Sequence, residues 1–172
     1  MDIFFDMLPV HGDGSLCTTI WRDTFDAARG QLGFAKLLAE AAGAGESGLG
    51  LFGRFRTSQG RMDLKKVGLF RIVTVARALA IRHHVVRRST LARLAGVKAL
   101  NIGAAGDLDA LIAAQETLID LLLAQQTEDI ERGTPPSNAV AVRRLSLQDR
   151  DRLRSALEAV GHIDEVMRGL LF

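Results

Sequence analysis

The residues with the clearest chemical potential are the basic side chains in the middle of the chain. Residues 54–98 hold twelve Lys and Arg and a single acid, a net charge of +11, whereas the other residues hold ten basic and nineteen acidic side chains, a net charge of −9. A cationic segment inside an acidic frame indicates an anionic partner or an acidic surface of the same protein. The alternative interpretation is that these charges only solvate one helix face.

Three of these cations favour a binding role. Lys65 and Lys66 fall in the first turn of a predicted helix, where the helix dipole disfavours positive charge. Arg77 falls on the apolar arc of the same helix, and a buried guanidinium needs a partner. Two possibilities stay open for Arg77: an acid from another helix, with Glu116 and Asp120 as candidates, or a cleft that takes a phosphate group.

Motifs of other chemistries are missing from the sequence. It holds no phosphate-binding P-loop, no dinucleotide fingerprint, no zinc-protease motif, no nucleophile elbow and no Cys pair. The four His are scattered, and the lone Cys17 cannot form an internal disulfide. Nucleic acid is not an expected partner, because no helix-turn-helix signature is evident and few aromatic residues lie among the cations. Asp6 remains, as either a solvated acid or a metal-binding carboxylate.

The elements that must position these residues are mostly helices. The chain is 48% hydrophobic but only 5% aromatic and has no Tyr, which argues against a β-sandwich. Helical periodicity and capping residues predict helices over 16–29, 32–42, 64–84, 107–132 and 147–171, with a short helix over 90–94. We expect an all-α fold, an antiparallel bundle of four to five helices. The glycine-rich segment 43–60 is expected to be a loop anchored by Leu49, Leu51, Phe52 and Phe55.

The first ten residues differ from the rest. They are apolar and aromatic and stop at Pro9, which predicts a short N-terminal strand left over from the sheet of a preceding domain. The expected organisation is therefore 1–14 as the last strand and turn of that domain and 15–172 as the helical domain. No apolar run reaches the roughly 18 residues of a membrane span, and the N-terminus does not resemble a signal peptide. We expect a cytoplasmic protein that does not enter a membrane.

Several sequence blocks are similar to one family. They are FFDMLPVHGD over 4–13, LGLFGRF over 49–55, MDLKKVGL over 62–69 and ARALAIRH over 76–83, with shorter matches at 90–94, 136–138, 145–146 and 149–150. With them the sequence resembles the nucleotidyltransferase substrate-binding domain. That domain ends bacterial signal-transduction proteins that also carry cyclic-nucleotide-binding, CBS and nucleotidyltransferase domains. The resemblance covers nearly the whole chain.

This resemblance implies a longer parent protein whose preceding domain is a nucleotidyltransferase. That domain would be related to the uridylyltransferases that modify PII-type nitrogen-regulatory proteins, in which three acidic residues hold two metal ions. Asp6 matches the third of these acids and is thus the implied catalytic and metal-binding carboxylate, while the first two would lie upstream. Leu8 stands where the family commonly has Arg, so one phosphate-facing cation is missing.

The resemblance also implies roles in the helical domain. Lys65, Lys66 and Arg77 would face the nucleotide phosphates or an acidic protein substrate, Asn138 would fix a loop near that face, and Arg54 joins the same binding set. Mg²⁺ and a nucleoside triphosphate are implied for the parent, and neither is expected in this chain alone, which should be inactive. The implied partners are the upstream nucleotidyltransferase and sensor domains and an acidic or PII-like protein.

Two readings from other classes stay open beside this one. The chain could be a non-catalytic helical module that relays a signal from upstream sensor domains. It could also be a dimerisation bundle built on the last helix, which would make the protein a homodimer.

Overall fold

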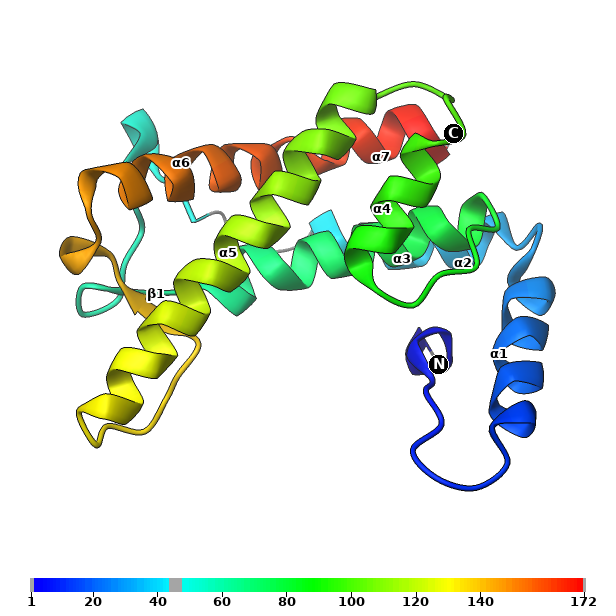
Figure 1. The fold of residues 1–172 in the computed structure, drawn as a ribbon. Coiled ribbons are helices and arrows are strands. Elements are labelled where there is room, and N and C mark those ends of the chain that lie inside the picture. Colours follow the sequence, from blue (N-terminus) through cyan, green and yellow to red (C-terminus); the bar gives the residue numbers. More distant parts are fainter. Residues whose placement is uncertain (1, 44–47, 172) are drawn as a thin grey trace.

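The computed structural model describes residues 2–43 and 48–171. Within these ranges the α-helices are α1 (Gly14–Ala28), α2 (Leu32–Gly43), α3 (Phe70–Arg82), α4 (Thr90–Lys98), α5 (Ala105–Glu131), α6 (Leu147–Gly161) and α7 (Ile163–Leu171), shown in Figure 1. The all-α class expected from the sequence is therefore confirmed. None of the helices in the described ranges combines the length and the apolar character that crossing a membrane requires.

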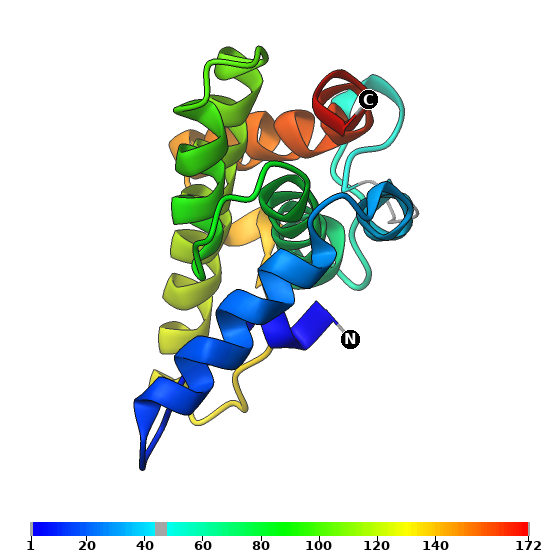
Figure 2. The same ribbon diagram turned by 90° about the vertical axis from the view of Figure 1, so that its right-hand side faces the viewer.

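Helix α3 is the centre of the fold. Its residues Ile72, Val75 and Leu79 have no exposed surface, because α2, α4 and α7 all pack against it. Figures 1 and 2 show α3 surrounded by the other helices. The apolar arc predicted for this segment is real, but its first turn is not α-helical: residues Lys65–Leu69 form a π-helical turn that leads into α3.

The long helix α5 packs against α6, α4 and the π-helical turn. It buries Leu108, Leu111 and Leu118 on its inward face, as its periodicity predicts. The π-helical turn approaches it closely at Gly68, where an added Cβ would lie 2.5 Å from Cδ1 of Leu118. A glycine therefore sets the distance between these two segments.

A short antiparallel sheet, which the sequence did not predict, ties the two halves of the bundle together. Strand β1 (Arg61–Asp63) pairs with β2 (Ala139–Ala141), with Met62 opposite Val140. Both of these apolar side chains are buried. Three residues are too few for an alternating pattern to stand out in a sequence.

A buried polar network fastens this sheet to α5. Oδ1 of Asp129 accepts hydrogen bonds from Nη2 of Arg61 and from Nε2 of Gln125, each at 2.9 Å. Oε1 of Gln125 in turn accepts the backbone N–H of Ala141 at 2.9 Å. The hydrogen bond from Arg61 is the main reason why the pKa of Asp129 lies below its ordinary value.

The strand predicted for the N-terminal segment is absent from the described structure. Residues Asp2–Asp6 form a 3₁₀-helix instead of a strand. Both strands of the described sheet lie elsewhere, so no strand edge is available to this segment. Its backbone carbonyls find side-chain donors instead: Nε1 of Trp21 donates to the Phe5 carbonyl at 3.0 Å.

Helix ends account for the other differences from the sequence prediction. The helix expected over 147–171 is interrupted at His162, which separates α6 from α7. Ser89 caps α4, Ser146 caps α6 and Asp13 caps α1, and α5 begins at Ala105, two residues before the predicted start at 107.

In the loop after α2, two of the four expected anchors are wrong. Leu49 and Phe55 pack against the core, but Leu51 is 82% and Phe52 is 97% exposed. Phe52 also has a φ of +60°, which bulky side chains rarely adopt. The tip of this loop is therefore an exposed apolar turn.

Candidate functional site

A cluster of charged side chains is built around Asp6. Nη2 of Arg93 in α4 lies 2.7 Å from Oδ1 of Asp6 and also donates to the Phe5 carbonyl at 2.7 Å. Nε of Arg93 donates to the Arg87 carbonyl at 2.8 Å. The Arg93 side chain is only 1% exposed. Burial lowers the pKa of Arg93 and the charge of Asp6 opposes this shift, so the pair is a buried guanidinium compensated by a carboxylate.

Arg77 in α3 is the second cation on this carboxylate. Its Nη2 donates to Oδ2 of Asp6, and its side chain is 11% exposed. The sequence left two possibilities open for Arg77, an acidic partner or a cleft, and the structure pairs it with an acid. The partner, however, is neither of the two candidates in the helix over 107–132: Glu116 is exposed, and Asp120 pairs with Arg152 at 3.2 Å.

A third arginine, Arg88, completes this arrangement. Its Nε donates to the Met7 carbonyl at 2.8 Å, and its guanidinium carbon lies 3.8 Å from the centre of the Trp21 ring. Stacking of this kind fixes a guanidinium in one orientation. We call Asp6 with Arg77, Arg88, Arg93 and Trp21 the N-terminal clamp. It fastens residues 5–7 to three helices, α1, α3 and α4, and to the connection before α4.

The clamp does not fit a metal ion. Both carboxylate oxygens of Asp6 face guanidinium groups, which would repel a cation at the same position. Across the described part of the chain, no group of three or more His, Cys, Asp or Glu side chains is placed to hold a metal ion. In this arrangement Asp6 is an anchor for the segment that carries it.

Two other predicted binding residues, Lys65 and Lys66, lie at the opposite end of the same helical segment. Lys65 and Lys66 are exposed at the start of the π-helical turn. Oδ1 of Asp63 accepts the backbone N–H of Lys66 at 2.9 Å, so an acid accompanies the cations at this helix start. The Asn138 carbonyl accepts the N–H of Leu64 at 3.0 Å, which places Asn138 beside the same turn.

The structure thus separates the predicted set into three places. Lys65 and Arg77 are twelve residues apart on one helical segment, which corresponds to about 18 Å along its axis. Arg54 lies in the exposed loop after α2, where its carbonyl accepts the N–H of Gly50 at 2.7 Å. Asp6 and Arg77 are in contact, and the backbone of Asn138 lies beside the turn that carries the lysines.

Sequence reasoning missed Arg93, Arg88 and Trp21 as parts of the site. Of the two described arginines that pair with Asp6, Arg93 is the more deeply buried. Its short helix has no strong hydrophobic periodicity, so the sequence did not single this arginine out as buried. A signal was present for Arg77, since a cation stood on an otherwise apolar arc. Contacts with residues 5–7 depend on tertiary structure and leave no local pattern.

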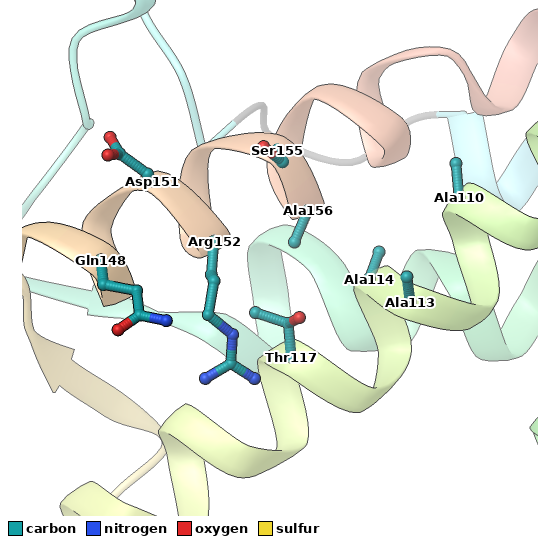
Figure 3. A pocket seen from close by; sticks show the side chains of 9 residues that line it. All are labelled: Ala110, Ala113, Ala114, Thr117, Gln148, Asp151, Arg152, Ser155 and Ala156. Atoms are coloured by element: carbon teal, nitrogen blue, oxygen red, sulfur yellow. The ribbon is translucent and has the colours of Figure 1, made fainter.

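A separate groove of about 600 Å³ runs between α5 and α6 and is shown in Figure 3. Its floor consists of Ala110, Ala113, Ala114 and Ala156. Arg152 reaches across it and is held by Asp120 at 3.2 Å. With its cation already paired, this groove offers a small apolar surface and no evident reactive group.

The described structure is thus a helical domain whose N-terminal segment is held by a cluster of cations. Comparison with protein families matches residues 33–169 to the family described as "Putative nucleotidyltransferase substrate binding domain". The chain belongs to this family. Comparison with curated proteins and with solved structures found no match.

Proposed function

We propose that this chain is the substrate-binding helical domain of a signal-transduction nucleotidyltransferase of the protein-PII uridylyltransferase type. In this proposal the domain covers the nucleotide site of a preceding catalytic domain with its basic side. The family to which residues 33–169 belong supports the substrate-binding role. The net charge of +11 over residues 54–98 supports an anionic ligand or partner.

The observation that carries the proposal is the pairing of Asp6 with Arg77 and Arg93. These two helical-domain cations hold the carboxylate that would belong to the catalytic domain. The pairing supports a resting arrangement in which Asp6 is kept from metal. When Asp6 turns to a metal ion in the parent, Arg77 would face the phosphates of the nucleotide in place of this carboxylate. Arg93 is more deeply buried and stays as the structural member of the pair.

Mg²⁺ and a nucleoside triphosphate would be bound in the parent by the preceding domain, with Asp6 as one of the metal-binding carboxylates. An acidic or PII-like protein is the proposed acceptor, and Lys65 and Lys66 are the exposed cations that would meet it. Upstream cyclic-nucleotide-binding or CBS domains would supply the regulatory signal, as in the bacterial proteins that the sequence resembles.

The test uses the full-length parent protein. Titration calorimetry with Mg²⁺ and each nucleoside triphosphate would be compared for the parent, for Arg77→Ala and for Arg143→Ala, an exposed arginine far from the clamp. Loss of one charge-assisted contact is expected to weaken nucleotide binding about tenfold or more in Arg77→Ala only. Unchanged affinity in a folded Arg77→Ala variant rejects the role of Arg77.

One observation favours a second candidate, a non-catalytic interaction or dimerisation module. Leu51 and Phe52 form an exposed apolar turn, and Phe52 keeps a rare backbone conformation there. Light scattering of the chain and of Phe52→Ser tests this candidate. A dimer that the variant dissociates supports it, and a strict monomer for the unmodified chain removes the dimerisation bundle.

A further inference from the structure

A cavity of about 560 Å³ lies directly beside the N-terminal clamp, between α1 and the connection from α3 to α4. It is lined by Trp21, Arg22, Asp26, His84, Val86, Arg87 and Arg88. We call it the Trp21 pocket. Its volume falls in the range of sites for small molecules, about 300–1,000 Å³. None of the residues proposed above to meet a nucleotide or a protein substrate lines it.

Positive charge dominates this pocket. Three guanidinium groups, from Arg22, Arg87 and Arg88, face a single carboxylate, from Asp26. That carboxylate already has a neighbour, because its Oδ1 lies 3.4 Å from Nε2 of His84. The lining therefore keeps a net charge of at least +2, and an anion is the ligand that would balance it.

One of the three cations is held in a fixed orientation. Arg88 stacks on the Trp21 ring at 3.8 Å, and its Nε donates to the Met7 carbonyl. The side chain is therefore already ordered in the free protein, so ligand binding does not have to restrict it further. A planar guanidinium held in this way suits a phosphate group, which accepts two parallel N–H donors. The other two, Arg22 and Arg87, are exposed at the rim of the pocket, where Nη1 of Arg87 makes a long hydrogen bond of 3.4 Å to the Val86 carbonyl.

His84 adds a further polar group. Its Nδ1 is buried and has no hydrogen-bond partner among the described residues. His84 also ends helix α3 with a φ of +54°, the left-handed position that glycine most often takes at a helix end. A histidine in this left-handed backbone conformation has a higher conformational free energy than a glycine would have, but it places an imidazole in the pocket lining.

From these features we propose that the Trp21 pocket binds the phosphate group of a small phosphorylated molecule. Arg88 is the fixed donor, Arg22 and Arg87 close on the phosphate from the rim, and the His84 ring meets the rest of the ligand. A small molecule fits better than a polymer, because the cations converge in one cavity with Asp26 in its wall instead of forming a stripe. The inference goes beyond the proposed function and does not depend on it.

The fluorescence of Trp21 provides the test, since Trp21 is the single tryptophan of the sequence and lines the pocket. The chain would be titrated, without Mg²⁺, with inorganic phosphate, pyrophosphate and ATP, and with adenosine as an uncharged control. Calorimetry would accompany each titration so that binding without a change in fluorescence is also seen. Saturable binding of the phosphate-bearing probes and none of adenosine is expected. The order of affinity among the three probes separates a site for free phosphate from a site for a nucleotide.

Variants decide whether the binding belongs to this pocket. Arg22→Ala and Arg87→Ala remove exposed rim groups, so they keep the fold, and each is expected to weaken binding about tenfold or more. Arg143→Ala removes an exposed arginine elsewhere and is expected to change nothing. Equal weakening by all three variants, equally strong binding of polyglutamate, or no binding of any phosphate probe overturns the proposal. The Arg77→Ala test on the parent reads Mg²⁺–nucleotide affinity, so the two proposals fail independently.

Discussion

Arg93 and Asp6 are 87 positions apart in the sequence, and Nη2 of the arginine lies 2.7 Å from Oδ1 of the aspartate. The arginine is almost completely buried, whereas the aspartate side chain is 40% exposed. The two residues therefore depend on each other unequally. Arg93 would be an uncompensated buried cation without Asp6, but Asp6 could leave and be hydrated by water.

Replacing Asp6 by Asn tests this dependence. The variant keeps the size of the side chain but removes its charge, and the buried Arg93 then loses the carboxylate that compensates it. We expect a loss of about 1–3 kcal/mol in the free energy of unfolding, measured by urea denaturation. The matched control is Asp109→Asn, which removes an exposed acid paired with Lys98 and should cost less than about 1 kcal/mol. Equal losses in the two variants would show that burial of Arg93 does not matter.

A change in pH near neutrality tests His83. Burial lowers the pKa of His83 below its ordinary 6.5, Arg82 adds to this, and the hydrogen bond to the Leu170 carbonyl opposes it. A depressed folded-state pKa gives stability that is present above 6.5 and is lost as the pH falls through the folded value. The free energy of unfolding should therefore drop between about pH 7.5 and pH 5.5, and drop less in His83→Gln. The exposed His11→Gln variant should follow the unmodified chain, and a steeper drop in His83→Gln would reverse the assignment.

Acid sensitivity at lower pH tests Asp129. The hydrogen bond from Arg61 lowers the pKa of Asp129 below its ordinary 3.8, so its stabilising contribution is complete above that value and is lost as the pH falls further. Asp129→Asn should therefore be less stable than the unmodified chain at neutral pH. The difference should shrink once the pH falls below 3.8. Denaturant titrations over this pH range measure it, and a difference that stays constant with pH contradicts the assignment.

The close approach at Gly68 gives a packing test. Gly68→Ala would bring a methyl group to 2.5 Å from the buried Leu118, and either that side chain or α5 must move. We expect a loss of about 1–3 kcal/mol in the free energy of unfolding. Gly169→Ala in α7 meets nothing within 4 Å and should stabilise the protein by up to about 1 kcal/mol, because alanine favours the helix. Thermal unfolding of the two variants should shift in opposite directions.

Periodicity in the sequence was sufficient for most of the fold. Ile72, Ala76 and Leu79 repeat at helical spacing and all lie in the core, because a long amphipathic helix carries its pattern over several turns. The two strands are three residues each, too short to carry such a pattern. The strand prediction for the N-terminal segment was wrong for a related reason. Its aromatic residues suit a strand, but a strand forms only where a neighbouring strand edge is available, and local sequence does not reveal that edge.

The candidate site was predictable only in part. Arg77 stood out because a buried cation on an apolar arc needs a partner, and the sequence left open whether that partner is an acid or a ligand in a cleft. Its partner Asp6 was singled out for another reason, and nothing in the spacing of the two residues joined them. Arg93 and the Trp21 pocket could be recognised only from the tertiary structure, because they combine residues of α1, α4 and the connection before α4.

The small sheet has a consequence for the order in which the chain folds. Arg61 pairs with Ala141, so the ladder closes a loop of 80 residues that contains α3, α4 and α5. Contacts across such a sequence separation are entropically expensive until the intervening helices have formed. The strands should therefore join late during folding. The turn that carries Lys65 and Lys66 begins at Leu64, whose N–H donates to the carbonyl of Asn138 just before β2. This basic turn would therefore be completed only in the last stage of folding.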